Sequence, residues 1–384
     1  MPARPRTNPF ASFWMGGFEC SCHINRHGER LDLLSATGHD ARADSDYALL
    51  RSEGIKVARD GVRWHLIERN GTFDFSSFQP LLEASSRQDV QVVWDLCHYG
   101  WPDGLDIFSA DFPRRFARFS RAIARLITEH DERPPLFIPI NEISYFAWAA
   151  GHAAEFHPFG RERAPELKRQ LVRAYLASVR AIREVAPQAR VLTAEPLINV
   201  VPPAGRPPPD DQCPAARMHE AQFEAWDMLA GRLHPELGGA ESHLDVLGVN
   251  FYPHNQWELP GGRTIRRDGP EADGRFRPLR FLLLDVWKRY RRPLFISETS
   301  CTPPGRADWL SYVTDEVIAA KAAGVPVYGV CLYPVIDRPD WEDSGHWHRS
   351  GLWDREAGPA GSVRLVLAEG YAAGFRRCRQ RLSS

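Results

Sequence analysis

Eight short apolar runs, spaced along the chain, constrain the fold of this sequence more than any other feature. They lie at residues 13–21, 54–64, 90–99, 135–142, 189–197, 244–252, 293–299 and 327–335. Amphipathic segments with apolar residues near a 3.6-residue period lie between them, most clearly at 112–130, 166–186 and 309–324. Runs that are apolar throughout are typical of parallel strands that helices cover on both faces.

Eight strand-then-helix units predict a (β/α)8 barrel. An open doubly wound sheet more often has five or six strands, and no Gly-x-Gly-x-x-Gly follows the first run. We therefore predict an α/β fold, a TIM barrel, that forms a single domain over residues 1–384. Long βα loops are expected at about 200–218 and 253–280, on the face where barrel enzymes build their sites.

Composition excludes several classes of partner. The formal net charge of −1 argues against nucleic acid or a membrane surface as a partner selected by bulk charge. No apolar stretch approaches 18 residues, and no signal peptide is visible at the start of the sequence, so we expect a cytoplasmic protein. Seven cysteines, an odd number, indicate free thiols in a reducing compartment. The oligomeric state is left open.

The tetrapeptide Pro-Leu-Phe-Ile occurs twice, and each time the apolar run ends on a glutamate, first Glu142 and then Glu298. Glutamate is a poor strand former and is rarely buried without a partner. Because the carboxyl ends of barrel strands open into one mouth, the two side chains would face each other there. Cleavage of a glycosidic bond requires such a pair, with one carboxyl group protonated and the other ionised.

Other strand ends carry polar and aromatic residues that a sugar site would use. Each has an ordinary structural explanation alone, but their common position at one end of the barrel favours a site. They are Arg59, Arg63 and Trp64 after the second run, Asp95, His98 and Trp101 after the third, Asn250 and Tyr252 after the sixth, and Asp337, Asp340 and Trp341 after the eighth.

These residues resemble the motifs of the clan A retaining glycoside hydrolases, and most closely those of family 1, the β-glucosidase group. Asn141-Glu142 is similar to the clan's Asn-Glu pair, and "FISETS" to the family's Ile-Thr-Glu-Asn-Gly segment. Five further segments are similar to family motifs in spacing and in order along the chain: "RDGVRW" (59–64), "HYGWP" (98–102), "GVNFYP" (248–253), "YPVIDRPDW" (333–341) and "RSGLWD" (349–354).

The resemblance implies a retaining β-glycosidase that needs no metal or cofactor. Glu298 would be the nucleophile and Glu142 the acid/base, with their carboxyl groups about 5 Å apart. Asn141 would bind the sugar's 2-hydroxyl, while Arg59 and Tyr252 would keep Glu298 ionised. The remaining expected sugar-binding or supporting residues are His98, Trp101, Asn250, Tyr333, Asp340, Trp341, His23 and Glu19.

The sequence departs from the family pattern at several positions. Ile143 replaces the Pro after Asn-Glu, and Thr299-Ser300 replace the Asn-Gly after the nucleophile. The remaining departures concern groups that hold the sugar: His23, with Glu19 nearby, stands where the family has Gln, Tyr333 where it has Trp, and Asp340 where it has Glu. These departures leave the identity of the sugar open.

Three other hypotheses remain. The first is an endo-acting or transglycosylating clan A enzyme that uses an oligo- or polysaccharide, and the second is a catalytically idle barrel that binds carbohydrate. The third, which we rank lowest, is a metal-dependent hydrolase using His346 and His348. The arginines of the segment 262–280 could contact an anionic aglycone, although a solvated basic loop is the favoured interpretation; they are Arg263, Arg266, Arg267, Arg275 and Arg277.

Overall fold

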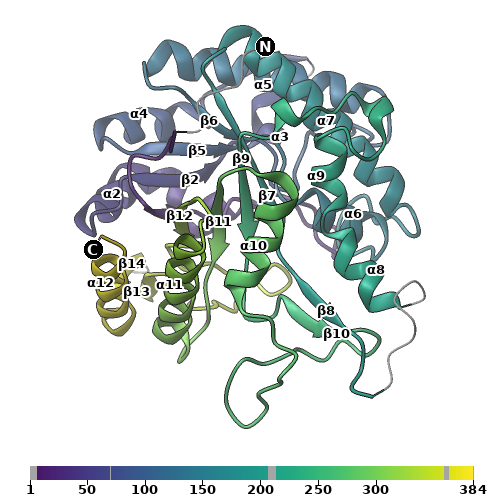
Figure 1. Ribbon diagram of the computed structural model, residues 1–384. Helices are drawn as coiled ribbons and strands as arrows, with labels where there is room; N and C mark the ends of the chain where they lie inside the picture. Colours follow the sequence, from purple (N-terminus) through teal and green to yellow (C-terminus); the bar gives the residue numbers. More distant parts are fainter. Residues whose placement is uncertain (1–6, 70, 206–212, 359–362, 384) are drawn as a thin grey trace.

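The computed structural model describes residues 7–69, 71–205, 213–358 and 363–383, and its centre is a closed barrel of eight parallel strands (Figure 1). The strands follow the order β1-β12-β11-β9-β7-β6-β5-β2 around the barrel. Each predicted run contains one of them, so the predicted fold class is confirmed. Their bounds are β1 Trp14–Gly17, β2 Val57–Gly61, β5 Gln91–Asp95, β6 Leu136–Ile138, β7 Arg190–Pro196, β9 Val246–Asn250, β11 Leu294–Thr299 and β12 Val327–Leu332.

Helices surround the barrel (Figure 1). The three predicted amphipathic segments correspond to α5, α7 and α11, with ends that differ from the predictions by at most three residues. The helices are α1 Leu33–Thr37, α2 His39–Ser52, α3 Trp64–Ile67, α4 Gln79–Arg87, α5 Asp111–His130, α6 Ile143–Gly151, α7 Ala164–Val185, α8 Pro214–Ala221, α9 Glu224–Leu229, α10 Leu279–Tyr290, α11 Arg306–Ala322 and α12 Glu369–Ser383, with short 3-10 turns at Pro235–Leu237 and Glu241–His243. No described helix is long and apolar enough to cross a membrane.

The interior of the barrel is filled by one apolar cluster to which all eight strands contribute, including Val57 of β2, Val93 of β5 and Val246 of β9. Side chains alternate between the two faces of a strand. Arg59 and Asp95 lie two residues beyond Val57 and Val93, so they face the same interior nearer its carboxyl end. The apolar floor therefore gives way to polar side chains at the mouth.

The two predicted long loops pair with each other. After β7 the chain forms β8 (Asn199–Val201), and after β9 it forms β10 (Gln256–Glu258), and these strands make a two-stranded parallel sheet. Residues 206–212 of the predicted loop at 200–218 lie outside the described residues. Two other small sheets, β3 (Glu68–Arg69) with β4 (Thr72–Phe73) and β13 (Trp353–Ala357) with β14 (Val363–Leu367), are antiparallel.

The arginines of the segment 262–280 all contact acidic residues. Arg263 and Arg275 both pair with Glu258 and Asp273, and the remaining pairs are Arg266–Glu271, Arg267–Asp268, Arg277–Asp285 and Arg280–Glu316. These ion pairs favour a solvated, internally neutralised loop over a binding site for an anionic aglycone.

Candidate active site

Glu298 lies at the carboxyl end of β11, where two donors hold its carboxylate. The register of β11 against β9 shifts between Ile296 and Glu298, an irregularity of the kind that re-aims side chains beside functional sites. Its Oε1 accepts from Arg59 Nη1 at 2.6 Å, and its Oε2 accepts from the Tyr252 hydroxyl at 2.7 Å. Both carboxylate oxygens are therefore fixed in the free protein, and one contact is a charged pair.

Arg59 is fully buried in β2, and all five of its N–H groups donate to acceptors. Nε and Nη2 reach the two oxygens of Asp95 at 3.1 and 2.6 Å, and Nη2 also reaches Asn141 Oδ1 at 2.7 Å. Nη1 donates to Glu298 and, at 3.1 Å, to the carbonyl of Ser297. A guanidinium with every donor used is a rigid support.

Glu142 follows β6 and precedes α6, with a left-handed backbone (φ 45°) that is uncommon outside glycine. Its Oε2 accepts from the Tyr99 hydroxyl at 2.5 Å and its Oε1 from Asn250 Nδ2 at 2.8 Å. Burial and the negative charge of Glu298 raise the pKa of Glu142 to about 7, against the effect of these two donors. Glu142 can therefore hold a proton near neutral pH.

Asn141 fixes the proton positions beneath the two glutamates. Because Arg59 can only donate, the amide atom facing it must be Oδ1, and Nδ2 then donates to His98 Nε2 at 3.0 Å and to the Tyr99 hydroxyl at 2.9 Å. His98 Nε2 is consequently an acceptor, and its Nδ1 carries the proton that Asp95 accepts at 3.0 Å. The Tyr99 hydroxyl, which accepts from Asn141, is left to donate to Glu142.

One network thus joins the two carboxylates, but their surroundings differ. The positive charge of Arg59 contacts Glu298. The contacts of Glu142 come from neutral groups, Tyr99 and Asn250. A pair of carboxyl groups in unequal surroundings is what allows one to remain ionised while the other holds a proton.

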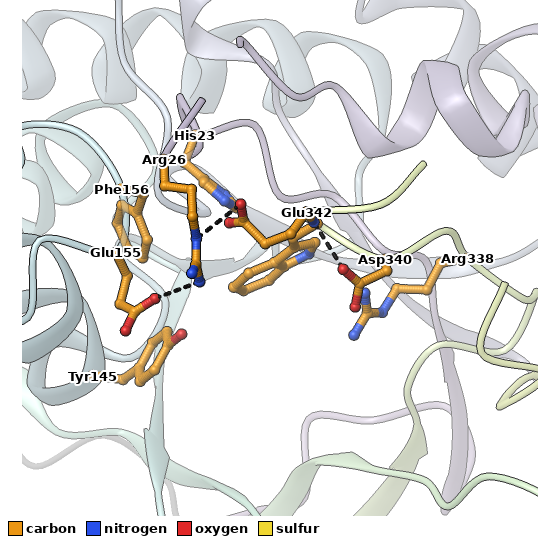
Figure 2. Close-up of a pocket in the computed structure, with 9 residues that line it drawn as sticks. His23, Arg26, Tyr145, Glu155, Phe156, Arg338, Asp340 and Glu342 are labelled. Carbon is orange, nitrogen blue, oxygen red and sulfur yellow. Dashed lines mark hydrogen bonds and ion pairs between the residues drawn. The ribbon is translucent and has the colours of Figure 1, made fainter. Parts of the chain in front are cut away.

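A cavity of about 230 Å³ lies near the mouth, lined by His23, Arg26, Tyr145, Glu155, Phe156, Arg338, Asp340, Trp341 and Glu342 (Figure 2). Arg26 bridges Glu155 and Glu342 across it, at 2.9 and 3.0 Å. Two ring nitrogens of its lining, His23 Nδ1 and Trp341 Nε1, are buried without a hydrogen-bond partner among the described residues. Burial lowers the pKa of His23 to about 3, so its ring is neutral.

Apart from Trp101, the predicted site residues fall into two groups. Arg59, His98, Asn141, Glu142, Asn250, Tyr252 and Glu298 share the network above, and the Tyr333 ring lies beneath the Arg59 guanidinium at 5.0 Å. His23, Asp340 and Trp341 line the cavity, and Glu19 supports it through its ion pair with Arg338 at 3.1 Å. The Asp340 carboxylate is already engaged, since it accepts from two backbone N–H groups of its own turn and contacts His348.

Trp101 is not brought into either group. It is buried, its indole N–H donates to the carbonyl of Leu105 at 2.9 Å, and its ring packs against Phe112 and Phe146. These contacts favour a packing role for Trp101 over contact with a sugar.

Sequence reasoning missed three residues around Glu142. Tyr99 was inside a quoted motif, but nothing in the sequence indicated that its hydroxyl would reach Glu142. Tyr145, in the first turn of α6, lines the cavity. Glu195 could have been found, because it ends the apolar strand β7 just as the other two glutamates end theirs.

His346 and His348 do not form part of a ligand cluster in the described residues. Three potential ligand atoms that lie within 4.8 Å of one another there belong instead to Cys20, Asp95 and His98. Both oxygens of Asp95 already accept from Arg59. The positive charge that Asp95 needs is therefore supplied by the Arg59 guanidinium, and Asp95 in turn accepts from His98.

Comparisons with known proteins show the fold. No family model matches the sequence, and neither does any curated protein sequence. Among solved structures, a β-glucosidase from Thermotoga maritima in complex with deoxynojirimycin has a TM-score of 0.75 at 15% identity, over 97% of this chain and 99% of that one. The same enzyme with glucoimidazole gives 0.76 at 15%, over 98% and 99%, and the structure named family 1 β-glucosidase gives 0.74 at 15%, over 97% and 99%. The chain therefore has the barrel fold of these enzymes along nearly its whole length.

Proposed function

We propose that this protein is a retaining β-glycosidase in which Glu298 is the nucleophile and Glu142 the acid/base. The observation that carries the proposal is the unequal surroundings of the two glutamates in one network. Arg59 and Tyr252 donate to both oxygens of Glu298 and stabilise its negative charge. Glu142, with a pKa raised to about 7 by burial and by Glu298, keeps a proton for the leaving group.

The reaction would proceed in two displacements. Glu298 attacks the anomeric carbon as Glu142 gives its proton to the glycosidic oxygen, which leaves with the bonding electrons. The ionised Glu142 then takes a proton from water, whose oxygen displaces Glu298 from the sugar. Retention requires a separation between the carboxyl groups of about 5 to 5.5 Å, and this separation stays a prediction.

The cavity would hold one sugar unit beside the two glutamates rather than over them. Neither Glu142 nor Glu298 lines it, but Tyr145 and Trp341 of its lining contact the ring of Tyr99, whose hydroxyl donates to Glu142. The unpartnered indole N–H of Trp341 matches a hydroxyl oxygen of a sugar, and the unpartnered His23 Nδ1 can donate to or accept from a second hydroxyl according to its tautomer. Buried polar atoms are rarely left unpaired without a reason. Both Nδ2 hydrogens of Asn141 are engaged in the free protein, so a 2-hydroxyl would have to replace His98 or Tyr99 as their partner. The names of the similar structures favour a glucose-like sugar, and the experiment below decides among sugars.

The test is a panel of 4-nitrophenyl β- and α-glycosides, assayed with the intact protein and with Glu298→Ala, each with and without azide. We expect one β-glycoside to be turned over, the variant to lose that activity, and azide to restore it by replacing the missing carboxylate.

Glu316→Ala is the matched control, because Glu316 is equally buried and ion-paired to an arginine but lies on α11. It should retain activity in proportion to its folded fraction. If no sugar of the panel is turned over, the proposal fails for small aglycones, and the endo-acting and idle hypotheses take its place.

A further inference from the structure

Glu195 is a buried carboxylate directly behind the proposed acid/base. Leu192 and Ala194 of β7 belong to the cluster inside the barrel, so Glu195, the next residue, points outward toward the helices. There its Oε1 accepts from the backbone N–H of Ile143 at 2.6 Å and its Oε2 from that of Ser144 at 3.0 Å. These are the first two residues of α6, the helix that Glu142 precedes.

This contact explains how the chain tolerates Ile143. A proline at this position would have no N–H, whereas the N–H of Ile143 is buried and needs an acceptor. A carboxylate at a helix N-terminus satisfies such groups and interacts favourably with the helix dipole. Glu195 therefore fixes the backbone of the two residues that follow Glu142.

Tyr99 holds Glu142 from the other side, by its carboxylate. Its hydroxyl accepts from Asn141 and therefore donates to Glu142 Oε2, and its own backbone is left-handed (φ 67°). A non-glycine residue in this conformation is uncommon, and such strain clusters at functional sites. Burial and the charge of Glu142 hold the pKa of Tyr99 well above its usual range, so the hydroxyl keeps its proton.

We propose that Glu195 and Tyr99 are positioning residues that hold Glu142 by its backbone and by its carboxylate, and that their opposite electrostatic effects set how readily Glu142 loses its proton. This inference rests on the proposed function for its kinetic consequence. Its geometric part stands on the four hydrogen bonds above.

The groups that face Glu142 come from five elements. Burial raises its pKa most, followed by the charge of Glu298, and the charge of Glu195 also raises it; the Tyr99 and Asn250 hydrogen bonds lower it. The remaining titratable neighbours are the phenols of Tyr145 on α6 and Tyr252 after β9. Burial raises the pKa of Glu195 itself to about 7, against the hydrogen bonds from Ser144 and Ile143 and the charge of Lys168 on α7, which lower it. Glu195 is therefore partly ionised over the pH range in which Glu142 titrates.

The two residues predict opposite shifts. Glu195→Gln removes a nearby negative charge but keeps an acceptor for the helix, so Glu142 should ionise more easily and the alkaline limb of kcat/KM should move down by roughly half a unit. Tyr99→Phe removes a hydrogen-bond donor that stabilises ionised Glu142, so the alkaline limb of kcat/KM should move up by about one pH unit. A general loosening of the site would instead move both variants in the same direction or lower the rate at every pH.

The experiment measures both the pH profile and the titration of Glu142 itself. Protein labelled with 13C at the glutamate carboxyl carbons is followed by NMR from pH 4 to 9, and the Glu142 signal is identified by its loss in Glu142→Gln. Glu316→Gln and Tyr290→Phe are the controls, because Glu316 caps α10 through the Arg280 N–H and Tyr290 donates to Asp227, both in the helical layer. Neither control should move the Glu142 titration.

Opposite shifts of the Glu142 titration in the two variants, with unmoved controls, support the inference. Shifts in one direction, or none, overturn it. If Glu195→Gln fails to fold, the Tyr99→Phe variant is sufficient for the test. An unchanged Glu142 titration in Tyr99→Phe also overturns the inference. If the Glu142 titration shifts in opposite directions but the protein turns over no glycoside, the proposed function is wrong and the positioning roles are still supported. The two failures are therefore distinguishable.

Discussion

Trp341→Phe tests whether the unpartnered indole N–H of the cavity is kept for a ligand. In the free protein this N–H is buried without an acceptor among the described residues, at a cost of about 1 to 3 kcal/mol. Phenylalanine removes the N–H and this cost, but it also loses ring atoms that contribute about 2 kcal/mol of burial. The two effects offset each other, so the free energy of unfolding should change by only about 1 kcal/mol or less.

Activity should respond differently. A hydrogen bond between the indole and a sugar hydroxyl contributes about 0.5 to 1.5 kcal/mol, which corresponds to a roughly 2- to 13-fold fall in kcat/KM. The measurements are urea unfolding and kcat/KM on the best 4-nitrophenyl glycoside, with both quantities obtained from the same preparations.

Trp64→Phe is the matched control, because the structure places Trp64 in the helical layer and not at the mouth: its ring packs against three phenylalanines of α5, it does not line the cavity, and its indole N–H donates to Glu68 at 2.7 Å. It should lose about 3 kcal/mol or more of stability while the folded fraction keeps its kcat/KM. The reasoning about Trp341 is refuted if its variant loses stability as the control does, or if kcat/KM is unchanged.

Three further changes have expected outcomes. Burial disfavours charged His39, but the charge of Asp60 and the hydrogen bond to Asp46 raise its pKa to about 9, so about 3 kcal/mol of stability is present below pH 6.5 and is lost as pH rises through 9. Urea unfolding from pH 6 to 9.5 should show this loss in the wild type and not in His39→Gln. Glu142→Gln should lower kcat/KM by about 10² to 10⁴ for poor leaving groups and much less for activated phenols, as a leaving-group series measures. Arg59→Lys cannot make five directed donations, so we expect a loss of about 3 to 5 kcal/mol in urea unfolding and a low kcat even in the folded fraction; wild-type kinetics would contradict this.

The fold could be predicted from the sequence because buried parallel strands appear in it as continuous apolar runs. The same continuity hides which face of a strand each residue occupies. Glu298 and Glu195 both end such runs, yet one lies at the barrel mouth and the other points outward beneath α6. The two glutamates can be told apart only in the closed barrel, which fixes which side chains of each strand point inward and which point outward.

Details of the site depended on backbone conformation and on neighbours distant in sequence. Tyr99 reaches Glu142 because its backbone is left-handed, a conformation that no local sequence pattern predicts. Trp101, two residues later, was predicted to face a sugar, whereas its contacts favour packing. An aromatic residue after a strand has the same sequence signature in either position. The motif spacing placed these residues after the barrel strands, where the structure has them, but it could not assign individual rings.

The pairing of β8 with β10 has a consequence for engineering specificity. These strands come from the loops after neighbouring barrel strands, and Asn199–Val201 align residue by residue with Gln256–Glu258. Transplanting one loop from another barrel would strip the other of its backbone partner and expose an unpaired edge. The two segments therefore form one module, and a chimera that replaces this side of the mouth should exchange them together.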